Sequence, residues 1–115
     1  MHELSFAATI LKDMYIWQQS QPGTRLSRVA IRVGELSGIE LDSLLVSFEF
    51  LTKGTKWDGL ALDIDYCPRL ERCDACGFDF VAEEFEIPCP ACRGRKTHCI
   101  GGTELDIAYI LSYQA

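Results

Sequence analysis

The sequence has no apolar run long enough to cross a bilayer, and its first residues, Met1-His2-Glu3-Leu4, lack the basic start of a signal peptide. Both absences predict a cytoplasmic protein, in which thiols stay reduced and paired cysteines bind metal. The sequence also has no Gly-rich phosphate loop, and no Ser/His/Asp or Cys/His set at a catalytic spacing. We therefore do not expect an enzyme.

Positive charge is scarce as well. Only 11 Lys and Arg stand against 17 Asp and Glu, which gives a formal net charge of −6. Within residues 67–103, five basic side chains face six acidic ones. A nucleic-acid-binding module needs a basic footprint. The charge balance therefore argues against a nucleic-acid-binding zinc ribbon.

Cysteine, by contrast, is abundant and ordered. Two Cys-x-x-Cys pairs are separated by twelve residues, and their members are Cys73, Cys76, Cys89 and Cys92. Each pair is short enough to grip one ion from a tight turn, and the segment between them is long enough to run out and back as a hairpin. Four thiolates then bind one Zn²⁺ tetrahedrally, with Zn–S distances of about 2.3 Å. The alternative is two disulfides, which a reducing compartment disfavours.

Hydrophobic periodicity predicts two helices and three strands outside the cysteine segment. The expected helices cover 4–20 and 41–53, and the expected strands cover 25–34, 60–66 and 104–113. The strand–helix–strand run in the middle predicts a parallel pair with a right-handed crossover. The fold class is therefore α+β, with a small three-stranded mixed sheet, two helices and an inserted zinc-ribbon-like module of four cysteines.

The last strand follows the cysteine segment, so one domain is built from both ends of the chain. We expect this domain to comprise 1–66 and 103–115, with an inserted zinc-binding domain at 67–102. The insertion has few apolar residues, so the metal would supply much of its folding free energy. Short hinges also leave open a homodimer formed by exchange of segments.

His2 is a second metal candidate. A histidine directly after the first residue offers one ion the free amine of Met1, its own backbone amide and its imidazole Nδ1, and Glu3 can supply a fourth donor. Such an in-plane set suits Ni(II) or Cu(II) better than tetrahedral Zn²⁺. The alternative is that His2 is an ordinary frayed terminal residue.

The roles of three further residues stay open. Cys67 and Cys99 lie outside both pairs and are expected to be small, semi-buried apolar residues. A disulfide between them would need the ends of the insertion to be adjacent. His98 is the only other histidine, and we expect it on a loop, although a place near the zinc is conceivable.

Four short motifs, together with the cysteine pairs, resemble a known family across essentially the whole chain. The motifs are Met1-His2-Glu3-Leu4-Ser5, Gly34-Glu35-Leu36-Ser37-Gly38, Phe48-Glu49 and Gly102-Thr103-Glu104-Leu105. With two Cys-x-x-Cys pairs between the last two motifs, the sequence looks like a hydrogenase nickel-maturation protein of the HypA/HybF family.

The resemblance implies a metallochaperone with a nickel-binding domain and an inserted zinc domain. It implies that Met1, His2 and Glu3 bind nickel, and that the paired cysteines hold structural zinc. It further implies a HypB-type GTPase as partner and delivery of Ni(II) to the large subunit of [NiFe]-hydrogenase, with urease served by some members. A zinc-ribbon adaptor that acts through protein contacts alone is the competing hypothesis.

The sequence departs from the family at one place. Some members carry a histidine directly after each cysteine pair, whereas here those positions are Gly77 and Arg93. A histidine-based switch at the zinc site is therefore not expected in this protein.

Overall fold

A computed structural model of the chain describes residues 2–84 and 87–114, and its internal contacts divide the chain into two units. The first, which we call the sheet–helix unit, consists of Met1–Arg32, Ile39–Asp65 and Asp106–Ala115. The second, the cysteine unit, consists of Val33–Gly38 and Tyr66–Leu105. No helix in the described part of the chain is long and apolar enough to span a membrane.

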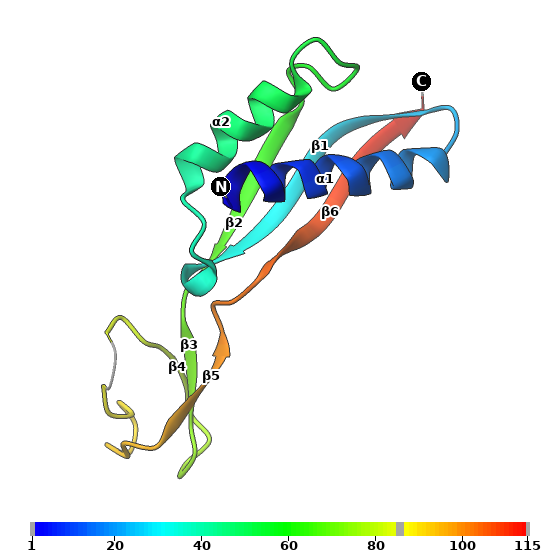
Figure 1. Cartoon of the computed structure of the whole chain (residues 1–115). Coiled ribbons are helices and arrows are strands. Elements are labelled where there is room, and N and C mark those ends of the chain that lie inside the picture. The colour runs from blue at the N-terminus through cyan, green and yellow to red at the C-terminus, as the bar shows by residue number, and fades with distance from the viewer. Residues whose placement is uncertain (1, 85–86, 115) are drawn as a thin grey trace. The chain divides into compact units, whose positions relative to one another are not determined.

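The sheet–helix unit contains two helices and a three-stranded sheet. The helices are α1 (His2–Gln19) and α2 (Leu41–Thr52), and the strands are β1 (Thr24–Gly34), β2 (Ala61–Cys67) and β6 (Leu105–Gln114). The strand order β2-β1-β6 places β1 in the centre. The arrows in Figure 1 show β2 running in the direction of β1 and β6 running against it. The predicted fold class, with a small mixed sheet and two helices, is confirmed.

The core of this unit follows from the spacing of apolar residues. Fully buried side chains recur on α1 three and four residues apart, on α2 four residues apart and on β1 at every second residue. They are Ala7, Ile10 and Met14 on α1, Leu44 and Phe48 on α2, and Val29 and Ile31 on β1. The helices therefore pack one face against the sheet, as their sequence pattern predicted.

Local signals fix both ends of α2. The Glu40 carboxylate caps its start by accepting hydrogen bonds from the backbone N–H groups of Asp42 and Ser43. At the other end Lys53 donates its N–H to Glu49 O at 3.1 Å, and Gly54 adopts a φ of 77°. A positive φ at this position is inexpensive only for glycine, so the helix stops here.

The cysteine unit contains a second antiparallel sheet. Its strands are β3 (Leu70–Cys73), β4 (Asp79–Val81) and β5 (Thr97–Gly101), in the order β4-β3-β5. The first cysteine pair therefore lies at the turn of a β3–β4 hairpin. This corrects the expectation that a hairpin lies between the two pairs, because one of its strands precedes Cys73 in the chain.

The segment Val33–Gly38 belongs to the cysteine unit by its hydrogen bonds. Gly34 donates its N–H to Glu104 O at 2.6 Å, and Leu36 donates to Gly102 O at 2.7 Å. The Glu35 carboxylate accepts from Arg69 N at 3.2 Å. Sequence analysis assigned this segment to the other domain, and the predicted domain boundaries at 66/67 and 102/103 stay a prediction.

Candidate metal centre

The four paired cysteines converge in the cysteine unit. The Sγ atoms of Cys73, Cys76, Cys89 and Cys92 all lie within 4.8 Å of one another. Two of these separations are 3.5 Å, from Cys73 to Cys92, and 3.7 Å, from Cys76 to Cys89. A tetrahedral ion with Zn–S bonds of about 2.3 Å places its sulfurs about 3.8 Å apart. The cluster therefore has the dimensions of a zinc site.

The same distances exclude the disulfide alternative for this arrangement. A disulfide requires an S–S separation of about 2.05 Å, and none of the six cysteines of the chain forms a disulfide. Cys67 is half-buried, and the Cys99 thiol is directed at Gly101 O at 3.1 Å. Cys99 is exposed, which corrects the expectation that it is semi-buried. No disulfide joins these two cysteines, and neither belongs to the four-sulfur cluster.

The two cysteine pairs are folded in the same way. In the first pair Gly77 donates its N–H to Cys73 O at 2.9 Å, and Cys73 donates to Phe78 O at 2.9 Å. In the second, the N–H of Arg93 bonds to Cys89 O at 2.7 Å, and that of Cys89 bonds to Gly94 O at 2.8 Å. Each turn buries its first cysteine and exposes its second. Two equal turns therefore present four sulfurs to one point.

Repulsion between the thiolates of the cluster favours a cation at its centre. Hydrogen bonding from the Cys76 backbone N–H, with smaller contributions from Ala75 N–H and the neighbouring thiols, lowers the pKa of the Cys73 thiol to about 7. At Cys76 the Phe78 N–H acts to lower the pKa, but burial and the three neighbouring sulfurs outweigh it and raise the pKa to about 12. One thiolate thus forms readily, and its negative charge opposes the ionisation of the neighbouring thiols. A divalent ion removes this repulsion by replacing the protons.

Apart from the four cysteines, the cysteine unit has few buried apolar residues to stabilise it. Its buried apolar cluster contains two of the ligands, Cys73 and Cys89, beside Phe80 and Ala82, with Ile87 packed against it. The four sulfurs fit a structural zinc site with all coordination positions filled by protein. Such a site cross-links the turns and leaves no position for a substrate.

The predicted nickel residues lie in the sheet–helix unit, at the start of α1. Met1 lies outside the described residues. His2 is exposed and is the first residue of α1, two positions earlier than the predicted start of the helix. The first four N–H groups of a helix have no acceptor within it, so the backbone amide of His2 is not committed to the helix.

Glu3 is held toward the start of α2. Its carboxylate accepts a hydrogen bond from Glu40 N at 3.4 Å. Beside it lies a hollow of about 390 Å³, whose lining includes Glu3, Leu4, Asp42 and Val46. Sequence analysis did not single out Glu40. Its only signal was its position directly before an apolar helix, where an acceptor side chain serves as a cap.

His98 was expected on a loop, but it lies on β5 and has a defined partner. Its Nδ1 lies 2.6 Å from the Asp74 carboxylate, between β5 and the first cysteine turn. Asp74 also donates its backbone N–H to Lys96 O at 2.9 Å. His98 therefore braces the turn that carries two ligands, and it is not a member of the four-sulfur cluster.

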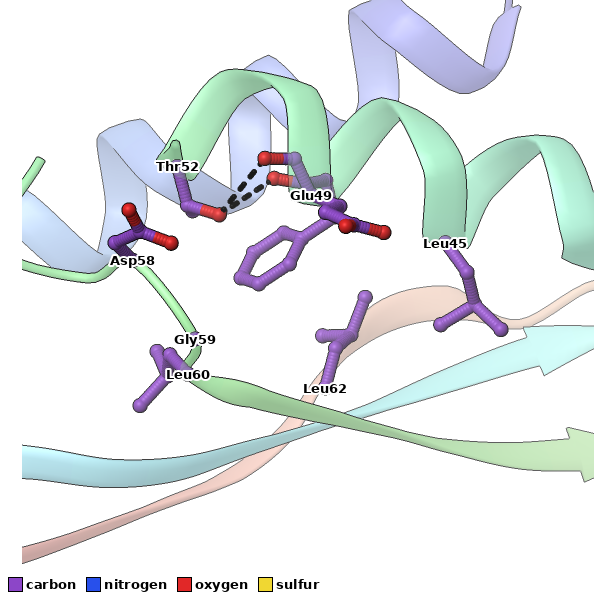
Figure 2. A pocket seen from close by; sticks show the side chains of 8 residues that line it. Leu45, Glu49, Thr52, Asp58, Gly59, Leu60 and Leu62 are labelled. Carbon is purple, nitrogen blue, oxygen red and sulfur yellow. Dashed lines mark hydrogen bonds between the residues drawn. The ribbon is translucent and has the colours of Figure 1, made fainter. Parts of the chain in front are cut away.

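A further cavity, of about 280 Å³, opens beneath α2 in the sheet–helix unit (Figure 2). Much of its lining is apolar, with Leu60 and Leu62 on the side opposite the helix in Figure 2. Phe48 of α2 also lines it. Glu49 and Asp58 are its only ionisable lining residues. The hydroxyl of Thr52 is engaged with the Phe48 and Glu49 carbonyls. Two carboxylates without a third ligand make this a packing gap and not a metal site.

Comparisons with known proteins agree over nearly the whole chain. The profile of the family described as "Hydrogenase/urease nickel incorporation, metallochaperone, hypA" matches residues 1–111. The hydrogenase maturation factor HypA of Syntrophus aciditrophicus is 35% identical over 104 residues, which are 90% of this chain and 91% of that protein. HypA of Geotalea uraniireducens is 34% identical over 107 residues, 93% of this chain and 94% of that protein.

Two solved structures share the fold. The solution structure of the Ni metallochaperone HypA from Helicobacter pylori is similar with a TM-score of 0.61 and 18% identity, covering 94% of each chain. A second solution structure of a HypA protein is similar with a TM-score of 0.69 and 20% identity, covering 96% of this chain and 94% of that one.

Proposed function

The chain belongs to the HypA family of hydrogenase/urease nickel-incorporation metallochaperones, and from that premise we propose that it binds Ni(II) at its N-terminus and helps to insert it into the large subunit of a [NiFe]-hydrogenase. Nickel is the cargo of this process, and the protein performs no catalytic step. The observation that carries the proposal is the position of His2, exposed at the first turn of α1 with its amide free of the helical hydrogen-bond pattern.

The proposed nickel ligands are the Met1 amine, the His2 amide and imidazole Nδ1, and Glu3. The amine and the amide close a five-membered chelate ring, and the amide and Nδ1 close a six-membered one. A nitrogen set in one plane is the environment that Ni(II) and Cu(II) prefer. Glu3 adds a carboxylate whose place near the helix start is supported by its hydrogen bond to Glu40 N.

This arrangement suits a site that must give up its metal. The ion would lie at the exposed end of the chain, where an incoming ligand can attack. The partial positive charge at a helix N-terminus disfavours a cation, and protons compete with nickel for the amine and the imidazole. Copper binds such donors more tightly than nickel, so we assign selectivity to docking with the delivery partner and not to affinity.

The four-cysteine cluster is able to bind zinc, and we propose a structural role for it. Cys73, Cys76, Cys89 and Cys92 would hold the ion, and the ion supplies the cross-link that a small apolar cluster does not. We further propose a HypB-type GTPase as partner, a homodimer as a possible assembly, the cytoplasm as the compartment, and domains at 1–66 with 103–115 and at 67–102.

An extension of the N-terminus distinguishes the nickel chaperone from the alternative, an adaptor that acts through protein contacts alone. Two extra residues before Met1 convert its amine into an amide and remove a ligand, while the surface of the folded protein is kept. Hydrogenase activity in a strain lacking the native chain should then fall to the level of the deletion strain. Full activity from the extended protein would support the adaptor and exclude the proposed nickel site.

A further inference from the structure

The sheet–helix unit carries a groove that the nickel and zinc sites do not use. A hollow of about 360 Å³ lies where the start of β1, the loop between α2 and β2 and the end of β6 meet. A second hollow of about 290 Å³ shares Leu26, Lys56, Trp57 and Tyr113 with the first. Because four lining residues are common to both, the two hollows form one continuous depression, which we call the basic groove.

Two basic side chains and one acidic side chain line this groove. The acidic one, Asp58 in the second hollow, is engaged within the protein, because its carboxylate accepts a hydrogen bond from Gly54 N at 3.0 Å. Arg25 and Lys56 line it, and among residues 2–84 and 87–114 neither forms an ion pair. Arg28 and Arg32, farther along β1, are by contrast each paired with a carboxylate at 2.8 Å and 2.6 Å. The two groove cations therefore remain available to an anion from another molecule.

Aromatic rings hold one of these cations in place. The Lys56 ammonium lies 5.0 Å from the centroid of the Trp57 ring and 5.9 Å from that of Tyr15. A cation–π contact orients an ammonium group without neutralising it. Tyr113 lines the groove together with Trp57 and is 54% exposed. The groove thus combines fixed positive charge with exposed aromatic surface.

We propose that the basic groove binds an acidic segment of a partner protein. Its carboxylates would pair with Arg25 and Lys56, and an apolar or aromatic side chain beside them would lie on Trp57 and Tyr113. Aromatic residues and arginine are the residue types that dominate binding energy at protein interfaces. This inference goes beyond the proposed function, since it does not depend on nickel.

The surroundings argue against a phosphate ligand. Helix α1 ends at Gln19 and α2 ends at Thr52, so both helices approach the groove with their carboxyl ends. Neither helix therefore offers the groove the free backbone N–H groups of an amino end, which phosphate sites use. Gln18 and His2 are sixteen residues apart on α1, about 24 Å at 1.5 Å per residue. A partner segment in the groove would leave the nickel end uncovered.

A random dodecapeptide display library, panned against the full-length zinc-loaded chain without nickel, tests the proposal. Enriched sequences should carry Asp or Glu next to aromatic or aliphatic residues. The strongest peptide is then measured by fluorescence anisotropy. Its affinity should fall as NaCl rises, because exposed charge pairs are screened by salt. In ¹⁵N spectra of the protein it should shift the Trp57 indole resonance.

Matched variants locate the binding. Arg25→Glu with Lys56→Glu should weaken the peptide at least about tenfold, as expected for loss of a paired charge at an interface. Arg95→Glu with Lys96→Glu makes the same change of charge in the cysteine unit and should leave affinity unchanged. Arg25→Gln with Lys56→Gln provides the test if charge reversal impairs folding, which melting curves reveal.

Four outcomes would overturn the proposal. They are enrichment of no sequence, enrichment of sequences that are not acidic, equal binding to the groove variant, and displacement of the peptide by GTP or by anionic phosphatidylserine vesicles. If the variants only lower the melting temperature while the peptide binds unchanged, then Arg25 and Lys56 stabilise the carboxyl ends of the helices and do not bind a partner.

Discussion

Arg93 occupies in the second cysteine turn the position that Gly77 occupies in the first. Their φ angles are 66° and 78°, and each donates its N–H to the carbonyl of the first cysteine of its pair. Arg93 is the only residue other than glycine with a positive φ in the described part of the chain. The positive φ thus follows from the hydrogen-bonded turn that the two cysteine pairs share, and not from a preference of arginine.

Replacing this arginine by glycine should stabilise the second turn. A residue with a Cβ costs roughly 1 kcal/mol in the left-handed region, so Arg93→Gly should raise the melting temperature of the zinc-loaded protein and slow zinc loss to a chelator. Gly77→Ala should do the opposite, because it introduces the same strain at the matching position. A lower melting temperature for Arg93→Gly would contradict this account of the turn.

Gly34 should not tolerate any side chain. A Cβ at this position would lie 2.1 Å from Gly102 O, a backbone atom that cannot move away cheaply. Gly34→Ala should therefore cost at least about 1–3 kcal/mol of unfolding free energy, the usual range for overpacking. Gly23→Ala is the control, since a Cβ there meets nothing within 4 Å and only its φ of 81° is unfavourable. Equal melting temperatures for the two variants would show that the Gly34–Gly102 approach is not tight in solution.

Zinc affinity should depend steeply on pH. The pKa of Cys76 is raised to about 12, and that of Cys92 is also raised, so both thiols carry protons at neutral pH when no metal is bound. Zinc uptake must release at least these two protons. The apparent affinity should therefore fall by about 100-fold or more for each unit that the pH decreases. Competition with a chelator between about pH 8 and pH 6 measures this slope.

Two cysteine variants complete the zinc test. Cys89→Ser should abolish stoichiometric zinc binding and unfold the cysteine unit, whereas Cys99→Ser should keep one equivalent of zinc. Cys99 lies outside the cluster and contacts Gly101 O instead. Zinc affinity that is flat across this pH range, or zinc loss in Cys99→Ser, would contradict the four-sulfur assignment.

Glu3 should bind nickel through its negatively charged carboxylate, and it should stabilise the fold through the hydrogen bond that a carboxylate oxygen accepts from Glu40 N. Glu3→Gln keeps an acceptor for Glu40 N, so the melting temperature should stay near that of the wild type while nickel affinity falls at least roughly tenfold. Glu3→Ala should lose both properties. Asp42→Asn removes a charge from the same hollow and should leave nickel affinity unchanged. If Glu3→Gln bound nickel like the wild type, the carboxylate would not be a ligand.

Periodicity and cysteine spacing were sufficient to predict much of this fold. The three- and four-residue spacing of Leu4, Ala7, Leu11 and Met14 predicted α1, although its buried residues are Ala7, Ile10 and Met14. Alternation of apolar residues predicted the central strand β1, because burial of one face is a local pattern in the chain. The Cys-x-x-Cys pairs predicted the metal cluster, because four sulfurs at this spacing have few other ways to be satisfied.

Features that depend on distant contacts were not predictable. The segment Val33–Gly38 looks in sequence like a simple turn after a strand, yet its hydrogen bonds run to Gly102 and Glu104. The same holds for His98, whose partner Asp74 lies 24 residues earlier. Arg25 and Lys56 come together with Trp57 only when β1 and the α2–β2 loop are folded side by side.

The nickel site is the central claim, and it rests on residues at the very start of the chain. Zinc-loaded protein with a native Met1 should be titrated with Ni(II) in parallel with His2→Ala, while zinc content is measured in both. The wild type should show the spectrum of a diamagnetic, square-planar Ni(II) centre, and His2→Ala should not, with zinc at one equivalent in each. Equal nickel binding by His2→Ala, or a wild-type protein that takes up zinc alone, would contradict the account.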